Sequence, residues 1–125
     1  MPSENDDLLG SVGEHLAAEA LARRGYAILA TRYRTAHGEI DLVCEHQGTL
    51  VFVEVKARAT LEFGSAAEAV TDRKKRKVAH MAAEYLAREE VVDTPCRIDV
   101  VAIDWALSEY PEITVYQWAF DVDRQ

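Results

Sequence analysis

The sequence predicts an α/β domain in which a mixed β-sheet is flanked by helices. Two segments carry apolar residues at helical spacing, and five others have the apolar, β-branched and aromatic residues typical of strands. Their order along the chain is helix, three strands, helix, strand, strand, which indicates the mixed sheet. The 125 residues fit a single domain, 1–125, that is long enough for one real core.

The first half of the chain contains a helix followed by three strands. The helix is expected over residues 8–24 and ends before Gly25, because glycine commonly follows the last helical residue. Its apolar stripe is expected to consist of Leu9, Val12, Leu16 and Ala20. Strands are expected over residues 26–33, 39–46 and 50–56, with a turn at Gln47-Gly48 between the last two.

The second half contains one helix and two strands. Thr71 is a suitable N-cap for a helix over residues 72–88, since its hydroxyl can accept a hydrogen bond from the first turn. Residues 97–103 and 113–118 predict the last two strands. Residues 57–70 form a loop that is long enough to carry function.

Composition and charge exclude several classes of protein. The sequence has no run of 18 or more apolar residues and no signal peptide at its acidic N-terminus, so we expect a cytoplasmic protein without membrane association. Two cysteines without metal-binding spacing argue against a zinc site or a disulfide framework. The net charge of −8 argues against a generic nucleic-acid binder. Most of it lies in residues 89–125, which hold nine acidic and two basic residues, so a basic face elsewhere stays open.

The strand over residues 50–56 combines a core face with a polar face. Side chains alternate along a strand, so the valines face one way and the other set faces the opposite way: Phe52, Glu54 and Lys56. A two-residue turn at Gln47-Gly48 would place Asp41 directly opposite Glu54 on the neighbouring strand, and Glu39 opposite Lys56. The Cβ atoms of Asp41 and Glu54 would then be about 5 Å apart.

Two facing carboxylates need an explanation, because they repel by about 3 kcal/mol at an effective dielectric constant near 20. Protonation of one carboxylate would remove the repulsion, and so would a cation between them. Magnesium suits this pair, because it binds few protein carboxylates and keeps several waters. A nearby lysine and metal-activated water are what phosphodiester cleavage requires. The alternative is a plain Glu39–Lys56 pair on a solvated face, with Asp41 and Glu54 merely exposed.

Basic residues provide candidate contacts to nucleic acid. The run RKKRK at 73–77 starts the second helix, where positive charge opposes the helix dipole. We therefore assign phosphate contacts to part of this run, with a solvated helix face as the alternative: Arg73, Lys74, Lys75 and Lys77. Arg32 and Arg34 alternate with Tyr33 on the strand beside the site and are further candidates, with edge-strand solubility as the alternative.

Longer motifs carry a family resemblance over residues 8–105. They are GEHLAAEALARRGY at 13–26, GEIDLV at 38–43, VFVEVKAR at 51–58, FGSAAEAVT at 63–71 and RIDVVAI at 97–103. In this order they resemble the YraN family of bacterial proteins. Asp41 followed by Glu54-Val55-Lys56 also resembles the PD-(D/E)xK nuclease motif, with Ile40 in place of the proline.

The resemblance implies a restriction-endonuclease-like fold, similar to that of archaeal Holliday-junction resolvases. Asp41 and Glu54 match the metal-binding acids of the motif, and Lys56 matches the catalytic lysine. Glu14 matches an acid that completes the metal site in related resolvases. Its position off the expected apolar stripe leaves a solvated glutamate as the alternative. The implied cofactor is Mg²⁺, with Mn²⁺ as a substitute.

Three functions follow as hypotheses. The favoured one is a metal-dependent endonuclease that hydrolyses DNA, with branched or flapped structures as candidate substrates and a homodimer by analogy with junction resolvases. The second is a nucleic-acid-binding module of the same fold that cleaves nothing and acts in a repair or uptake complex. The third is a metal-independent interaction domain whose acidic C-terminal third docks a basic partner.

Overall fold

The computed structural model describes residues 4–58, 71–105 and 110–120. Its elements are α1 (Glu4–Arg23), β1 (Ala27–Thr35), β2 (Gly38–His46), β3 (Thr49–Arg58), α2 (Asp72–Arg88), β4 (Cys96–Asp104) and β5 (Glu112–Phe120). The predicted α/β class and element order are confirmed. The predicted loop 57–70 begins inside β3, and its residues 59–70 lie outside the described part of the chain. Within the described ranges, neither helix is both long and apolar enough to span a membrane.

The five strands form one mixed sheet in the order β1-β2-β3-β4-β5. The pairs β1–β2, β2–β3 and β4–β5 are antiparallel, whereas β3 and β4 are parallel and are connected through α2. The turn between β2 and β3 has positive φ at both central residues, +51° at Gln47 and +81° at Gly48. This conformation matches a two-residue hairpin, and His46 pairs with Thr49 as the sequence predicts.

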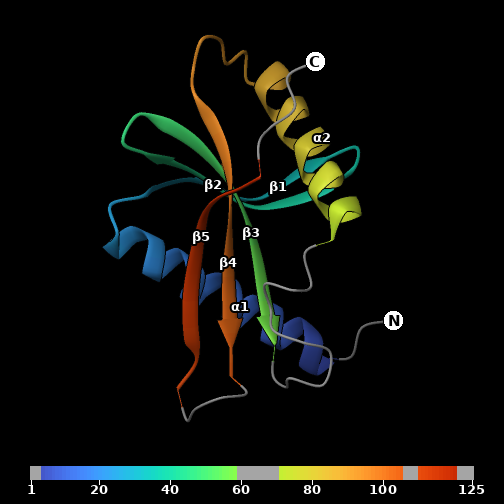
Figure 1. Cartoon of the computed structure of the whole chain (residues 1–125). Coiled ribbons are helices and arrows are strands. Elements are labelled where there is room, and N and C mark those ends of the chain that lie inside the picture. Colours follow the sequence, from blue (N-terminus) through green and yellow to red (C-terminus); the bar gives the residue numbers. More distant parts are fainter. Residues whose placement is uncertain (1–3, 59–70, 106–109, 121–125) are drawn as a thin grey trace.

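The two helices cover opposite faces of the sheet (Figure 1). The core between α1 and the sheet combines Ala17 and Leu21 of the helix with Leu42, Cys44, Val51, Val53, Val101 and Ile103 of the strands, together with Tyr26. The core between α2 and the sheet combines Val78, Met81 and Ala82 of the helix with Ile40, Val43, Leu50, Phe52 and Ile98 of the strands. The alternation predicted for β3 is confirmed, because its valines lie under α1 whereas Phe52 lies under α2.

The buried stripe of α1 differs from the predicted one. Val12 is 41% exposed, and the buried side consists of Leu21 and three small residues, Gly13, Ala17 and Ala20, of which Ala20 was in the predicted stripe. Small residues let the helix approach the sheet closely, and a Cβ added to Gly13 would meet the Cβ of Ala57 at 3.2 Å. The predicted stripe is therefore correct at Ala20 and in part at Leu16, which packs against the core, and is wrong at Val12. Glu14 therefore lies beside the buried side of α1, since residues 14, 17 and 21 share one face of the helix.

A buried polar network lies under α1 at the other end of the sheet. Arg97 is hydrogen-bonded to Asp99 at 3.0 Å, to the hydroxyl of Tyr26 at 3.1 Å and to Nδ1 of His46 at 2.8 Å. Tyr26 also donates to Asp99 at 2.8 Å and stacks on His46.

Candidate active site

The sheet divides at the end of the β2–β3 ladder. The last pair between these strands is Leu42–Val53. Beyond it, β2 continues to pair with β1 and β3 continues to pair with β4 as far as Arg58. Figure 1 shows the result as two arms, one formed by β1 and β2 and the other by β3, β4 and β5. The candidate site lies where these arms separate.

Asp41 occupies the point of separation. Its Oδ2 accepts a hydrogen bond of 2.8 Å from the backbone N–H of Val55. The Asp41 carboxylate thus satisfies the backbone N–H of Val55, which lies beyond the last residue pair between β2 and β3. The predicted register holds up to Leu42–Val53, but the ladder ends before it reaches Asp41 and Glu54. These two acids are neighbours across the separation rather than members of a regular strand pair.

Glu54 and Lys56 lie on the α2 side of β3, as the alternation predicts. The Nζ of Lys56 is 3.0 Å from Oε1 of Glu54, and the Glu54 side chain is only 14% exposed. Glu39 instead pairs with Arg34, at 3.4 Å between Oε1 and Nε. The alternative of a Glu39–Lys56 pair on a solvated face is therefore not the arrangement that forms.

The electrostatics of Asp41 are unusual. The pKa of its carboxyl is raised from 3.8 to about 8, first by burial and then by the neighbouring charges of Glu54 and Glu14. The hydrogen bond from Val55 and the ammonium of Lys56 act in the opposite direction on this pKa. In the absence of a cation the most stable state at neutral pH is a protonated Asp41. A bound cation would replace that proton and stabilise the carboxylate.

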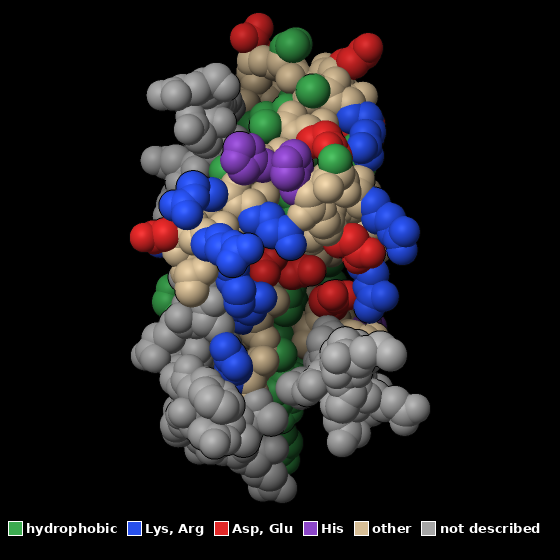
Figure 2. All heavy atoms as spheres, turned by 90° about the vertical axis from the view of Figure 1, so that its right-hand side faces the viewer, with side chains coloured by type: hydrophobic (Ala, Val, Ile, Leu, Met, Phe, Trp, Pro, Cys, Tyr) green, Lys and Arg blue, Asp and Glu red, His purple; other side chains and the backbone are tan. Residues whose placement is uncertain are grey.

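Both arms and α2 enclose a cavity of about 160 Å³ around these acids. It is lined by Glu39, Asp41, Glu54 and Lys56 from the strands and by Lys74, Lys77, Val78 and Met81 from α2. In Figure 2 acidic side chains lie near the centre of this face, partly beneath Lys and Arg side chains. Opposite charges therefore meet in one hollow, with carboxylates from the sheet and ammonium groups from the helix.

The structure divides the basic run of α2 into two sets. Lys74 and Lys77 line the cavity, and Lys77 is at the same time exposed to solvent, whereas the exposed Arg73 and Arg76 do not line it. Lys75 does not line it either, and its Nζ lies 4.0 Å from Oδ1 of Asp72. Thr71 caps the helix as predicted, accepting from the backbone N–H of Lys74 at 3.3 Å, and this cap fixes where the run begins.

Glu14 and Arg32 lie on the opposite side of the sheet from α2. Nε of Arg32 is 2.9 Å from Oε2 of Glu14, whose side chain is 26% exposed. This pair lines a second cavity of about 260 Å³ between α1 and β1. Glu14 does not line the cavity of Asp41, but its charge raises the pKa of Asp41 and so reaches the site. Arg34, in contrast, is 87% exposed beside Glu39.

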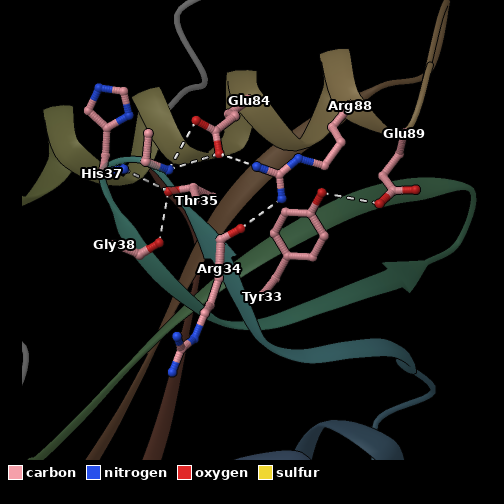
Figure 3. A network of polar contacts seen from close by, with 9 residues as sticks. Tyr33, Arg34, Thr35, His37, Gly38, Glu84, Arg88 and Glu89 are labelled. Atoms are coloured by element: carbon pink, nitrogen blue, oxygen red, sulfur yellow. Dashed lines mark hydrogen bonds and ion pairs between the residues drawn. The ribbon is translucent and has the colours of Figure 1, made fainter.

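Side-chain contacts hold α2 to the tip of the β1–β2 arm (Figure 3). The carboxylate of Glu84 accepts from the backbone N–H of Ala36 at 3.0 Å and from Arg88 at 2.8 Å. Arg88 also donates to the carbonyl of Arg34 at 2.8 Å, and Tyr33 donates to Glu89 at 3.1 Å. These contacts fix the orientation of the helix that carries Lys74 and Lys77.

The side chains available for a metal ion are two carboxylates. Among the described residues, no three His, Cys, Asp or Glu side chains come close enough to hold a metal together. Asp41 and Glu54 line one cavity, and one oxygen of Asp41 is already used by Val55. Such a donor set fits Mg²⁺, which takes one or two carboxylates and completes its shell with water and phosphate oxygens.

Sequence reasoning missed that Lys74 and Lys77 enter the site. The signal was present, since residues 74, 77, 78 and 81 follow helical spacing and Val78 and Met81 are buried. Lys74 and Lys77 continue the buried face of α2 towards the helix N-terminus, so their side chains lie on the side that faces the sheet. Gly38 is a second missed residue. It has φ of +133°, and a Cβ there would meet Cε of Lys77 at 3.1 Å.

Comparison with known proteins identifies relatives over most of the chain. The sequence model of a family described as "Uncharacterised protein family UPF0102" matches residues 13–103. A UPF0102 protein of Roseiflexus castenholzii is 49% identical over 100 residues, which cover 79% of this chain and 81% of the relative. One from Clavibacter michiganensis subsp. michiganensis is 40% identical over 119 residues, covering 95% and 99% of the two chains. One from Chlorobium phaeobacteroides is 39% identical over 114 residues, covering 91% and 90%.

Proposed function

The chain belongs to the UPF0102 family, the YraN family that its motifs resemble, and on this premise we propose that it is a metal-dependent endonuclease acting on DNA. The observation that carries the proposal is the pair Asp41 and Glu54, which line one cavity with Lys56 and lie close enough for the charge of Glu54 to oppose ionisation of Asp41. A divalent cation is the ligand that relieves this repulsion, and phosphodiester hydrolysis is the chemistry that such a cation beside a lysine serves.

Each residue of the cavity has a role in the proposal. Asp41 and Glu54 would hold Mg²⁺, or Mn²⁺ in its place, and the bound ion would supply an activated water and polarise the phosphate. Lys56 would stabilise the negative charge that develops on the phosphate, held in place by its contact with Glu54. Glu14 would assist from the far side of the sheet through its effect on Asp41 and its ion pair with Arg32.

The remaining cations are proposed to contact the DNA backbone. They are Arg32, Arg34, Arg73, Lys74, Lys75 and Lys77. The proposal includes a restriction-endonuclease-like fold related to that of junction resolvases. The mixed sheet with a helix on each face is consistent with such a fold. Branched or flapped DNA is the proposed substrate, a homodimer the proposed assembly and the cytoplasm the proposed location.

A second candidate function is a nucleic-acid-binding module that keeps the site but does not cleave. The observation that favours it is the small ligand set: Glu39 also lines the cavity but pairs with Arg34, and no three metal-binding side chains of the described residues are grouped closely enough to hold an ion. Such a module would still need the lysines of α2 to bind phosphate.

Cleavage separates the two functions. The purified chain is incubated with labelled linear, flapped and four-way DNA in the presence of Mg²⁺, Mn²⁺ or EDTA. The endonuclease predicts metal-dependent products from at least one substrate, and these products disappear with EDTA. Binding of the same DNA without any product under either metal would establish the non-cleaving module instead.

A further inference from the structure

The candidate site contains two pairs of like charges side by side. Asp41 and Glu54 form the acidic pair described above. Lys56 of β3 and Lys74 of α2 form a basic pair, because both side chains line the same cavity. Burial lowers the pKa of Lys74, and the charge of Lys56 lowers it further. Each pair is unfavourable in isolation, since like charges repel at short range.

The two pairs require different ligands. A cation alone would relieve the repulsion between the carboxylates but would leave the two ammonium groups opposed. A phosphate alone would relieve the repulsion between the lysines and add to that between the acids. A divalent cation that carries a phosphate as one of its ligands relieves both. The cavity of about 160 Å³ has room for this combination, given about 30 Å³ for each water-sized group.

The position of Lys74 is imposed by the fold. Thr71 caps α2 through the backbone N–H of Lys74, so this lysine lies in the first turn, where its charge opposes the helix dipole. Its neighbour Lys75 has Asp72 nearby and does not line the cavity. Adjacent residues of equal charge therefore have different environments, and of these two only Lys74 adds to the charge beside Lys56.

We propose that Lys74 and Lys56 together bind the non-bridging oxygens of a phosphate that is also a ligand of the cation held by Asp41 and Glu54. This inference rests on the proposed function, since it places a phosphate of the substrate at the proposed metal ion. It gives Lys74 a specific task within the site, distinct from the general backbone contacts of Arg73 and Lys75. It also makes the binding of cation and nucleic acid reciprocal, each strengthening the other by the same factor.

The test measures this coupling by binding and does not depend on cleavage. The affinity for Ca²⁺, used as the probe cation, is determined by calorimetry with and without a short DNA oligonucleotide at fixed salt. In the wild-type chain DNA is expected to raise the Ca²⁺ affinity about tenfold, a usual size for coupled sites. Lys74→Ala should reduce this factor to near one while the affinity for Ca²⁺ alone is maintained. Arg76→Ala, the matched control, removes an exposed cation of the same helix that does not line the cavity and should retain the wild-type factor.

Folding is controlled independently. Alanine favours helices and removes a cation from a helix N-terminus, so Lys74→Ala should unfold at the wild-type temperature or above it. Lys74→Gln, which keeps a long polar side chain without charge, should lose the coupling as alanine does. Wild-type coupling in both Lys74 variants, or equal loss in Arg76→Ala, would overturn the inference.

The outcomes also separate this inference from the proposed function. Coupling that depends on Lys74 in a chain that cleaves no DNA would support the phosphate site and reject the endonuclease. Cleavage by the wild-type chain, together with unchanged coupling in Lys74→Ala, would reject only the phosphate site. A wild-type chain that binds no Ca²⁺ with or without DNA would reject both.

Discussion

The carboxylate of Asp41 accepts a hydrogen bond of 2.8 Å from the backbone N–H of Val55, at the point where β2 and β3 stop pairing. This hydrogen bond connects the two arms of the sheet and places an acid beside Glu54 at the same time. One oxygen of Asp41 thus has a structural partner, while burial and the charge of Glu54 oppose ionisation of the group.

The first prediction concerns pH and stability without metal. The folded chain holds the Asp41 proton up to about pH 8, whereas the unfolded chain releases it near pH 3.8. The folded state therefore binds more protons between these values, and the free energy of unfolding should fall as pH rises from about 4 to about 8. The contribution is fully present below this window and lost above it. Urea unfolding at several pH values in EDTA measures the slope.

Asp41→Asn should flatten this slope, because asparagine can still accept from Val55 but does not ionise. At pH 8 the variant should be more stable than the wild-type chain, by an amount on the order of 1 kcal/mol or more. Glu19→Gln on the exposed side of α1 serves as the control and should keep the wild-type slope. Parallel curves for Asp41→Asn and the wild type would contradict the raised pKa.

The second prediction concerns the metal ion. Millimolar Mg²⁺ or Mn²⁺ should raise the melting temperature, because the ion binds the folded chain and not the unfolded one. The rise should be larger at pH 8 than at pH 6, since the ion must displace the proton of Asp41. Asp41→Asn should largely remove the rise. Thermal unfolding by circular dichroism tests this, and identical curves with and without either metal would count against the site.

The third prediction concerns Lys56. Lys56→Ala should leave metal affinity nearly intact, because the ligands are the two carboxylates, and DNA binding should weaken only slightly. Cleavage should fall by roughly a hundredfold or more, the usual cost of deleting a group directed at transition-state charge. Lys56→Arg should restore activity only in part, because a planar guanidinium does not replace a compact ammonium. Cleavage rates, compared with DNA affinities, measure the difference.

A Lys56→Ala variant that cuts as fast as the wild-type chain would assign the observed cleavage to a contaminant or to another site. The matched control is Arg76→Ala, which removes a positive charge of α2 outside the cavity. This control should retain most of the cleavage rate.

The fourth prediction concerns salt. Replacing Lys74, Lys75 and Lys77 with alanine should weaken binding to all DNA sequences alike, because phosphate contacts carry no sequence information. The log–log dependence of affinity on salt should also become flatter, by up to about 0.9 for each phosphate that the variant no longer neutralises. Titrations by fluorescence anisotropy at several salt concentrations provide the slopes. Equal slopes for the variant and the wild-type chain would make the run a solvated helix face.

Local rules predicted the parts of the fold that depend on neighbours in sequence. The hairpin at Gln47-Gly48 and the cap at Thr71 were both predictable, because each depends on the conformation of a few adjacent residues. From the hairpin, the alternation along β3 and the position of Glu54 and Lys56 followed.

The separation of β2 from β3 was not predictable in this way. It depends on how far β1 and β4 each extend their pairing, which is a property of the whole sheet. The buried side of α1 was predicted only in part for a related reason, since close packing at Gly13 and Ala17 favours small residues over large ones such as Val12. The entry of Lys74 and Lys77 into the site likewise requires knowledge of which strand faces α2.

Helix α2 is attached to one arm of the sheet and contributes side chains to a cavity that both arms line. The C-terminal half of this helix is bonded to the β1–β2 arm through Glu84 and Arg88, while its first turn reaches the β3 arm near Lys56. The position of α2 therefore depends on both arms of the divided sheet. Under the proposed function, Glu84→Ala would weaken the attachment of α2 to the β1–β2 arm and would lower the affinity of Asp41 and Glu54 for a cation, although Glu84 does not line their cavity.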